Sequence, residues 1–437
     1  MREVQTGSSG KAKSGRIDYP AEAKEQRRTF GDIFFAPDKL LLTNMLRAIG
    51  DPPVQLELWN GQTISNHDGN EVARVLIHDR GALLKLVADA ELYFGEMYSA
   101  QRIEIQGNLL DFLEAVYRAL PLQNQGRTGK KLLSSFYDAR RNTLNGSRRN
   151  IHHHYDIGND FYKLWLDERM LYTCAYFPEP STSLEDAQLA KMDHVCRKLR
   201  LQPGDQVVEA GCGWGALALH MAKHYGVKVT AYNISREQII YARQRAQAEG
   251  LDGQVEFIED DYRNVLGKFD VFVSVGMLEH VGTDHYQELG SVINRVLKDT
   301  GRGLIHTIGL NFPRPMDAWT ERHIFPGASP PSLGQMMQIF EPFDLSVLDV
   351  ENLRLHYAKT LEHWLQRYEN NVERVSEMFD ADFVRAWRLY LAGSLTAFKM
   401  GGMQLFQVTF TRADNNQIPW TREYLYETQQ GASGGKL

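Results

Sequence analysis

The stretch Glu209-Ala-Gly-Cys-Gly-Trp-Gly215 decides the fold of this chain. A short run with β-forming residues, Asp205 to Glu209, precedes it, and a run with helical character, Ala216 to Tyr225, follows it. Glycine adopts positive φ without steric cost and has no Cβ atom, so the backbone of such a turn can approach a ligand closely. A strand that ends in Glu-x-Gly-x-Gly and opens into a helix therefore predicts a nucleotide-cofactor site in an α/β fold.

The glycine spacing is compatible with two classes of cofactor. Gly211, Gly213 and Gly215, with an acid at Glu209, suit the amino-acid tail and ribose of S-adenosylmethionine better than a pyrophosphate. The pattern Gly211-x-Gly213-x-x-Ala216 also fits the dinucleotide fingerprint. A dinucleotide domain would want an acid for the ribose where Asn233 ends the next strand, which weakens the dinucleotide alternative.

From Pro203 onward the sequence alternates between strand and helix patterns, which is typical of a parallel α/β sheet. A helix from Leu184 to Leu199 precedes this part, and Thr182 with Glu185 predicts a capping box at its start. A helical insertion rich in Trp, Tyr, Met and Leu, about Ala358 to Lys399, separates the last two expected strands. The expected strands cover residues 207–210, 228–232, 255–258, 269–275, 303–307, 345–350 and 405–410.

The N-terminal part predicts a separate, small α+β domain. Its expected strands are 54–59, 74–77 and 103–105, and its expected helices are 81–93 and 109–119. The first 30 residues are polar and are expected to form a mobile arm. We divide the chain into an N-terminal domain with this arm (1–122), a basic linker (123–150), a larger α/β domain (151–427) and a flexible tail (428–437).

Composition limits the classes of function. The net charge of −6 argues against a general nucleic-acid-binding protein. Only three cysteines occur, far apart in the chain, so we expect neither a disulfide framework nor a zinc site. The chain contains no apolar run of roughly 18 residues that could span a membrane. It also lacks an apolar signal core, and we expect a cytoplasmic protein.

The linker concentrates positive charge. Residues 126–150 hold seven basic residues and one acid, and several apolar side chains fall on one helical face. One interpretation is an ordinary solvated helix. The other is an element that docks the protein on the anionic inner face of a membrane, where each Lys or Arg contributes on the order of 1 kcal/mol.

Polar residues follow the ends of several expected strands, where ligands bind in an open α/β sheet. Glu279 and His280 follow one apolar strand, and His306 ends another. These residues could be a helix cap and core histidines. Together with the phenol of Tyr357 they could also bind an anion or hold a base.

Two further motifs carry weaker chemistry. Cys174 could be a nucleophile, but nothing nearby in the sequence would lower its pKa, which favours a packing or backbone role. The run His152-His-His-Tyr155 looks like a metal tract, but adjacent side chains do not converge on one ion, so we expect no metal site.

The chain resembles the cyclopropane-fatty-acyl-phospholipid synthase family and the related mycolic-acid cyclopropane synthases. The N-terminal α+β region is also similar to the extra lipid-binding domain of the bacterial phospholipid-acting branch. The resemblance rests on motifs that follow one another within residues 150–411: His153-His-Tyr-Asp-Ile-Gly-Asn-Asp-Phe-Tyr162, Tyr172-Thr-Cys-Ala-Tyr176, Glu209-Ala-Gly-Cys-Gly-Trp-Gly215, Gly276-Met-Leu-Glu-His-Val-Gly282, Leu304-Ile-His-Thr-Ile-Gly309, Ile324-Phe-Pro-Gly327 and His356-Tyr-Ala-Lys-Thr-Leu361.

This resemblance implies a class I methyltransferase fold, a Rossmann-like sheet with a helical insertion. It implies S-adenosylmethionine as the methyl donor and the cis double bond of an unsaturated phospholipid acyl chain as the acceptor, with a cyclopropane fatty acid as the product. The residues that would line the cofactor are Tyr172, Thr173, Gly211, Gly213, Asn233, Ile234, Gln238, Asp261 and Tyr262. The position of Asn233 is usually Thr in the family.

The resemblance also implies a bicarbonate ion that serves as the base. The matching positions are Cys174 and Ile308 through their backbones, and Glu279, His306 and Tyr357 through their side chains. It further implies a homodimer that associates peripherally with a phospholipid bilayer.

Other functions stay open at this point. A related methyltransferase would stop at a methyl- or methylene-branched acyl chain. A non-catalytic lipid-binding protein would not need the intact glycine turn and the full set of anion-site residues. An NAD-dependent oxidoreductase is disfavoured by Asn233.

Overall fold

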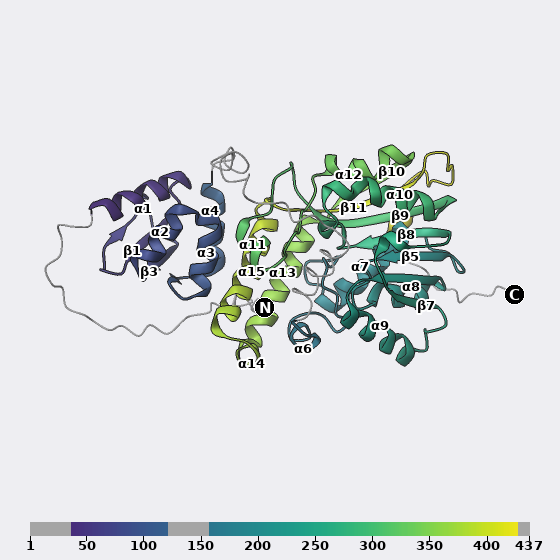
Figure 1. Ribbon diagram of the computed structural model, residues 1–437, viewed down its shortest axis with the longest axis horizontal. Helices are drawn as coiled ribbons and strands as arrows, with labels where there is room; N and C mark the ends of the chain where they lie inside the picture. Colours follow the sequence, from purple (N-terminus) through teal and green to yellow (C-terminus); the bar gives the residue numbers. More distant parts are fainter. Residues whose placement is uncertain (1–35, 121–156, 427–437) are drawn as a thin grey trace, which may run out of the picture.

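The computed structural model describes residues 36–120 and 157–426, whose strands form two separate sheets. Figure 1 shows the small N-terminal sheet at one end of the molecule and the large sheet at the other, with a group of helices between them. The arm, the basic linker, His152 to Tyr155 and the tail lie outside the described residues, and the domain boundaries stay predictions. Among the described helices, none has the length and apolar character needed to cross a bilayer.

The small unit has the strand order β2-β1-β3-β4. Its strands are β1 (Val54–Leu58), β2 (Thr63–Ile64), β3 (Ala73–Ile77) and β4 (Ile103–Gln106), and its helices are α1 (Ala36–Ala48), α2 (Arg80–Ala88), α3 (Ala90–Ser99) and α4 (Leu109–Ala119). Val54, Leu56 and Leu58 alternate with half-buried residues and face the core of the unit. The expected α+β architecture is confirmed.

The large sheet has the strand order β10-β11-β9-β8-β5-β6-β7. Strands β5 to β9 are parallel, and β11 is antiparallel to both β9 and β10. The strands are β5 (Gln206–Ala210), β6 (Lys228–Asn233), β7 (Val255–Glu259), β8 (Phe269–Val275), β9 (Leu297–Gly309), β10 (Leu345–Asn352) and β11 (Gln404–Arg412). The chain changes direction across the sheet between β5 and β8, and ligands bind at such a switch point.

Helices cover both faces of this sheet. Val207 of β5 shares a buried cluster with α7 (Leu184–Lys198), α8 (Ala216–Tyr225) and α9 (Arg236–Glu249). Its neighbour Val208 shares a cluster with α10 (Tyr286–Val296) and α12 (Leu333–Phe340). Successive side chains of a strand point to opposite faces, and both faces are covered by helices, so the parallel strands are apolar on both sides. A ligand can therefore reach this sheet only at the ends of its strands.

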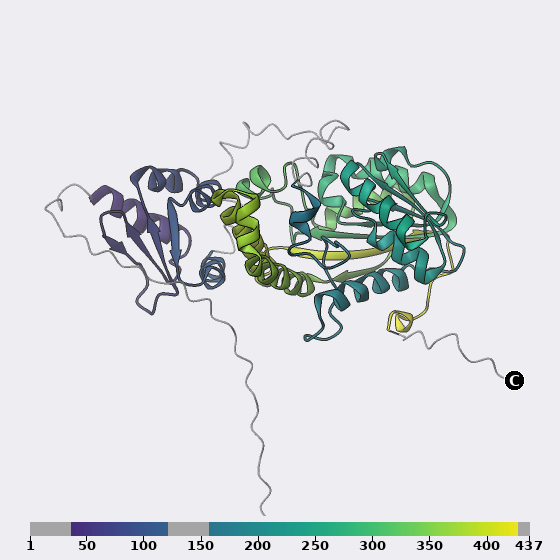
Figure 2. The same ribbon diagram turned by 90° about the horizontal axis from the view of Figure 1, so that it is seen from below.

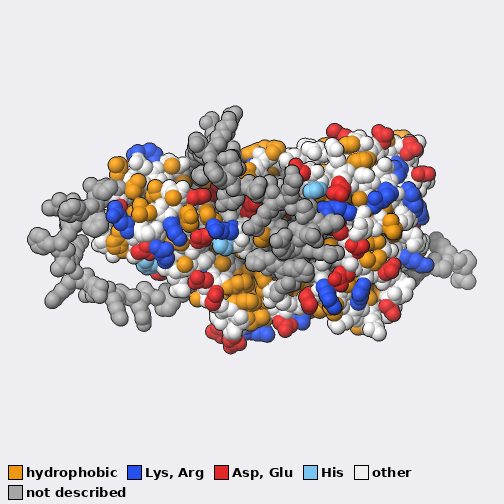
Figure 3. Space-filling model, viewed as in Figure 1, with side chains coloured by type: hydrophobic (Ala, Val, Ile, Leu, Met, Phe, Trp, Pro, Cys, Tyr) orange, Lys and Arg blue, Asp and Glu red, His pale blue; other side chains and the backbone are white. Residues whose placement is uncertain are grey.

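The predicted insertion is a group of aromatic-rich helices beside the sheet. It consists of α13 (Arg354–Asn370), α14 (Val372–Met378) and α15 (Ala381–Lys399). The short helices α6 (Asn159–Tyr162) and α11 (Ala318–His323) contribute side chains to the same buried cluster. Trp165 has its ring centroid 5.5 Å from that of Trp364 and 5.9 Å from that of Trp387. Figure 2 shows α15 running between the small unit and the large sheet, and Figure 3 shows hydrophobic side chains over this region.

The small unit packs directly on the insertion. Arg385 of α15 donates hydrogen bonds to the backbone oxygens of Tyr98 and Ile103, over 2.7 and 3.2 Å. The ring of Trp319 on α11 lies so close to Gly95 of α3 that an added Cβ atom would stand 2.5 Å from it. The two units therefore share an interface that needs the absence of a side chain at Gly95.

Two local predictions are wrong. The single helix expected over 81–93 is two helices, because Asp89 is extended, with φ of −157°, and its side chain caps α3 by accepting from the N–H of Leu92. The cap of α7 is Ser183 and not Thr182, since the Ser183 hydroxyl accepts from the N–H of Asp186.

Candidate active site

The glycine turn joins β5 to α8 with three residues in the left-handed region. Gly211, Gly213 and Gly215 have φ of +84°, +54° and +83°. An added Cβ atom at Gly211 would stand 2.9 Å from Met277, and one at Gly215 would stand 2.6 Å from Phe257. At Gly213 an added Cβ would meet nothing within 4 Å. Gly211 and Gly215 therefore allow close packing, whereas Gly213 faces open space.

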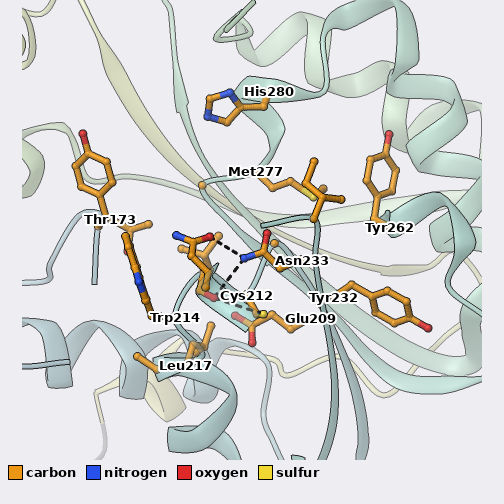
Figure 4. Close-up of a pocket in the computed structure, with 18 of the residues that line it drawn as sticks. Thr173, Glu209, Cys212, Trp214, Leu217, Tyr232, Asn233, Tyr262, Met277 and His280 are labelled. Atoms are coloured by element: carbon orange, nitrogen blue, oxygen red, sulfur yellow. Dashed lines mark hydrogen bonds between the residues drawn. The ribbon is translucent and has the colours of Figure 1, made fainter. Parts of the chain in front are cut away.

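A pocket opens at this turn, at the carboxyl ends of β5, β6 and β8 (Figure 4). Every residue predicted to line the cofactor contributes to its wall: Tyr172, Thr173, Gly211, Gly213, Asn233, Ile234, Gln238, Asp261 and Tyr262. The structure thus brings together residues that are up to 90 positions apart in the sequence. Their contacts with a cofactor stay a prediction.

Asn233 ties the end of β6 to the glycine turn. Its amide nitrogen donates to Gln238 Oε1 over 2.7 Å and to the backbone oxygen of Gly213 over 3.3 Å (Figure 4). Its Oδ1 accepts from the backbone N–H of Ser235. A threonine has a single O–H donor and could not donate both of these hydrogen bonds. Asn233 therefore connects the glycine turn to Gln238 in a way that threonine at this position could not.

Two buried charges in the pocket wall were missed as a pair by sequence reasoning. Lys191 of α7 is fully buried, and its ammonium donates to the Thr173 hydroxyl over 3.0 Å. Burial lowers the pKa of Lys191 to about 8 and raises that of Glu209 to about 8, while their opposite charges oppose both shifts. Glu209 Oε2 is buried and has no partner among the described residues. An ammonium group of a ligand could satisfy it.

Other contributors to the pocket come from distant segments. The phenol oxygens of Tyr172 and Tyr390 of α15 are 2.6 Å apart, which links the pocket to the insertion. The indole N–H of Trp214 donates to Asn159 of α6 over 2.7 Å. Lys191 shares the buried face of α7 with Gln188 and Lys198, a placement that only the packing of the helix shows.

Glu279 lies in the short helix η2 (Leu278–His280), directly after β8, and is buried. Its Oε1 accepts from the backbone N–H of Ile308 over 2.6 Å. Its Oε2 is buried and without a partner in the described part of the chain. Burial raises the pKa of Glu279 to about 7, against the opposing effects of the bond from Ile308 and of the nearby Thr307 hydroxyl. Ile308, whose backbone was expected to contact the anion, therefore has its N–H engaged by Glu279.

His306 lies near the end of β9 and is buried. Its Nδ1 is 3.0 Å from the amide nitrogen of Gln407 on β11. Its Nε2 is buried and meets no hydrogen-bonding partner within the described residues. Burial, together with the nearby charges of Lys191 and Lys198, lowers the pKa of His306 well below its usual value, so the imidazole is neutral.

Cys174 and Tyr357 both contact the backbone oxygen of Leu353, which lies next to the strands of the anion site. The Cys174 sulfur is 4.0 Å from the backbone oxygen of Leu353, which also accepts from the N–H of Tyr357. Leu353 in turn donates to the backbone oxygen of Leu405, the cross-strand partner of Ile308. Burial raises the pKa of the Cys174 thiol, which fits a packing or backbone role and not a nucleophile.

The predicted anion-site residues are not part of the lining of the cofactor pocket, although Cys174 and Glu279 are next to lining residues in sequence. Glu279, His306 and Tyr357 do not line the pocket, but Met277 and His280, on either side of Glu279, do. Within residues 36–120 and 157–426, no cluster of His, Cys, Asp and Glu has the arrangement of a metal site.

Comparison with known families gives two matches. The family described as mycolic acid cyclopropane synthetase matches residues 142–408, and a domain of unknown function matches residues 41–122. A probable fatty acid methyltransferase of Pseudomonas putida is 36% identical over 385 residues, covering 86% of this chain and 96% of that protein. The cyclopropane-fatty-acyl-phospholipid synthase of Escherichia coli K12 is 40% identical over 270 residues, covering 61% of this chain and 68% of that protein.

Solved structures agree with the fold. The mycolic acid cyclopropane synthase CmaA1, solved in complex with SAH and CTAB, superimposes with a TM-score of 0.58 at 29% identity, covering 61% of this chain and 98% of that one. The cyclopropane synthase MmaA2 of Mycobacterium tuberculosis gives a TM-score of 0.58 at 26% identity, with the same coverage. The predicted class I methyltransferase fold is confirmed.

Proposed function

Because the chain belongs to the mycolic acid cyclopropane synthetase family, we propose that it converts the cis double bond of an unsaturated phospholipid acyl chain into a cyclopropane ring, with S-adenosylmethionine as the one-carbon donor. The chain is by family an S-adenosylmethionine-dependent methyltransferase, and its relatives modify lipid acyl chains. The ring-forming reaction and the phospholipid acceptor are inferred from the Escherichia coli relative and from the site.

The pocket suits the proposed methyl donor. Gly213 presents bare backbone to open space, so the amino-acid tail of a cofactor can lie against it. The unpartnered oxygen of Glu209 is an acceptor for the ammonium group of that tail. S-adenosylmethionine, when bound, supplies an electrophilic methyl group at a sulfonium.

The insertion suits an apolar acceptor. Tyr172 of the pocket wall has its ring centroid 5.3 Å from that of Trp364 and 5.2 Å from that of Trp165. Attack of an alkene on the methyl group places positive charge on the acyl chain, which water would trap. Aromatic faces exclude water and attract a cation, so these side chains would stabilise the positive charge that forms on the acyl chain.

The observation that carries the proposal is a pair of buried polar atoms without partners, Glu279 Oε2 and His306 Nε2. The carboxylate can accept a hydrogen bond, and the imidazole can donate one if its proton is on Nε2. A small anion with its own O–H group matches both atoms, as bicarbonate does. Bicarbonate, when bound there, would supply the base that takes a proton from the new methyl group so that the ring can close.

A second product is favoured by one observation. The Pseudomonas putida relative, which matches over most of this chain, is named as a probable fatty acid methyltransferase, and a tuberculostearic acid methyltransferase of Mycobacterium tuberculosis is 35% identical over 280 residues. The alternative function is therefore methyl transfer without ring closure, which gives a branched acyl chain.

The proposed partners follow from the substrate. We propose that the enzyme acts as a homodimer, docked peripherally on a phospholipid bilayer at the inner face of the membrane. The positive charge of the linker, seven basic residues and one acid over 126–150, supports the docking, and the homodimer is what the family resemblance implies.

The anion site is tested by Glu279→Gln. Glutamine keeps the acceptor for Ile308 but replaces the open oxygen with a donor, so most turnover should be lost while calorimetry shows unchanged S-adenosylmethionine affinity. Tyr357→Phe should lose tenfold or less, since one hydrogen bond is worth roughly 0.5–1.5 kcal/mol. Glu256→Gln makes the same change at an exposed position of β7 and should be silent.

Bicarbonate itself provides the second arm of this test. Removing dissolved carbon dioxide and bicarbonate should slow the wild-type enzyme, and adding bicarbonate should restore the rate. Full speed in rigorously bicarbonate-free buffer would show that another group is the base.

A further inference from the structure

Three polar side chains stand side by side across neighbouring strands, leading away from the anion site. The strand register pairs His306 of β9 with Gln407 of β11, and Gln407 with Glu351 of β10. Residues directly opposite each other in antiparallel strands point to the same face, with their Cβ atoms about 5 Å apart. The row therefore continues from the anion-site imidazole into the sheet.

The first contact of this row is between Gln407 and His306. Gln407 is completely buried; its amide nitrogen lies 3.0 Å from Nδ1 of His306, and its Oε1 has no hydrogen-bonding partner among the described residues. An amide nitrogen can only donate, so Nδ1 accepts and carries no proton. A neutral imidazole holds one proton, which must then be on Nε2, the atom that is buried without a partner in the described chain.

The far end of the row is already compensated. Glu351 Oε2 lies 2.7 Å from Nε2 of His194 and 2.6 Å from the Lys198 ammonium. Burial raises the pKa of Glu351, but the hydrogen bond from His194 and the charge of Lys198 outweigh it and lower the pKa to about 2. The carboxylate is therefore held by its own cation, and the neutral Gln407 separates it from His306.

We infer that Gln407 is a positioning residue: its side-chain amide donates to Nδ1 of His306 and so fixes the imidazole in the tautomer whose Nε2–H points to the anion site. The inference rests on the proposed function, because a donor at Nε2 is useful only if an anion binds there. A carboxylate at position 407 would instead accept from Nδ1–H and turn a lone pair toward the anion.

The ring-nitrogen NMR spectrum of the full-length protein, labelled in its histidines, tests this directly. We expect His306 to show a protonated Nε2 and an unprotonated Nδ1 at pH 7.5, before any bicarbonate or cofactor is added. His306→Asn identifies its signals among the 14 histidines. A protonated Nδ1, or protons on both nitrogens, in the wild-type protein would overturn the inference.

Gln407→Glu should move the His306 proton to Nδ1, weaken bicarbonate binding and lower turnover by about tenfold or more, as expected for replacing a donor to an anion by a lone pair. Gln407→Met should lower turnover less, because it removes the restraint without imposing the other tautomer. Gln404→Glu makes the same chemical change at another buried glutamine of β11 and should leave the His306 spectrum unchanged.

The outcomes separate this inference from the proposed function. If Gln407→Glu leaves the His306 tautomer as in the wild type, the inference is wrong whatever the activity. If the tautomer reverses as expected but wild-type turnover does not depend on bicarbonate, the role of Gln407 stands and bicarbonate as the base is rejected.

Discussion

At Gly213 the backbone has φ of +54°, and the space beside it is open to the cofactor pocket. An alanine there costs on the order of 1 kcal/mol of backbone strain and also puts a methyl group where a cofactor would lie. We predict that Gly213→Ala greatly weakens S-adenosylmethionine binding in calorimetry. Gly250, the cap of α9, has φ of +67° with no atom nearby, so Gly250→Ala carries similar strain without the effect on binding. Equal affinities in the two variants would contradict the assignment.

The charge of Glu279 predicts a pH-dependent stability. Its pKa is raised from 4.5 to about 7 by burial, so the wild-type fold loses stability as the pH rises from about 4.5 to about 7. Glu279→Gln removes this loss, which is at most on the order of 3 kcal/mol. In bicarbonate-free buffer without cofactor, the melting temperature of the variant relative to wild type should rise between pH 5 and pH 8. A melting-temperature difference that does not change with pH would show that the charge of Glu279 does not destabilise the fold.

Single residues differ in how far the sequence reveals them. The glycine turn was predictable because its spacing is local and each glycine has a steric reason. Lys191 was not singled out, because a lysine is normally exposed and only the packing of α7 shows that its ammonium reaches Thr173. Gln407 was not singled out for a similar reason: its partner His306 is 101 positions away, and only the register of the strands places the two side by side.

At the scale of elements, the contact between α3 and α11 holds the small unit against the helical insertion. An added methyl group at Gly95 would stand 2.5 Å from the ring of Trp319, so Gly95→Ala should cost about 1–3 kcal/mol through overpacking and lower the melting temperature. Gly334→Ala, in a helix where an added Cβ meets nothing within 4 Å, should cause no loss. A Gly95→Ala protein as stable as wild type would mean that the two units do not pack in solution as described.

Strand patterns predicted most elements of the large sheet because buried parallel strands form apolar runs. Strand β9 extends further than expected, over Leu297–Gly309, because Leu297 pairs with Phe269 of β8 ahead of a register shift, and the mostly polar residues 298–301 lie in that irregular stretch. The break at Asp89 was missed because a residue that caps the next helix also fits a helical pattern. Local sequence does not show which of these two roles an aspartate takes.

For the whole molecule, the linker charge predicts how the enzyme reaches its substrate. Replacing Lys130, Lys131, Arg140 and Arg141 with Gln should weaken binding to anionic phospholipid vesicles, most strongly at low salt. A matched control replaces Lys228, Arg236, Lys268 and Arg374, which are exposed elsewhere, with Gln. Equal loss in both variants would indicate a general charge effect, and no loss in either would reject docking by the linker.

The arrangement of the units could not be read from the sequence. The basic linker indicates that two parts exist, but the hydrogen bonds from Arg385 to Tyr98 and Ile103 join positions more than 280 apart. Such contacts depend on how the insertion folds on the sheet. The family motifs fixed the identity of the site residues, whereas the structure supplied the partners that act on them.

The most direct test of the central claim is the identity of the product. The full-length protein is incubated with S-adenosylmethionine and vesicles of a cis-unsaturated phospholipid, and the released fatty acids are analysed by mass spectrometry and proton NMR. The account predicts an acyl chain heavier by one methylene group, with the double bond replaced by cyclopropane ring protons. Acyl chains that are unchanged, or that carry a methyl branch without a ring, would contradict it.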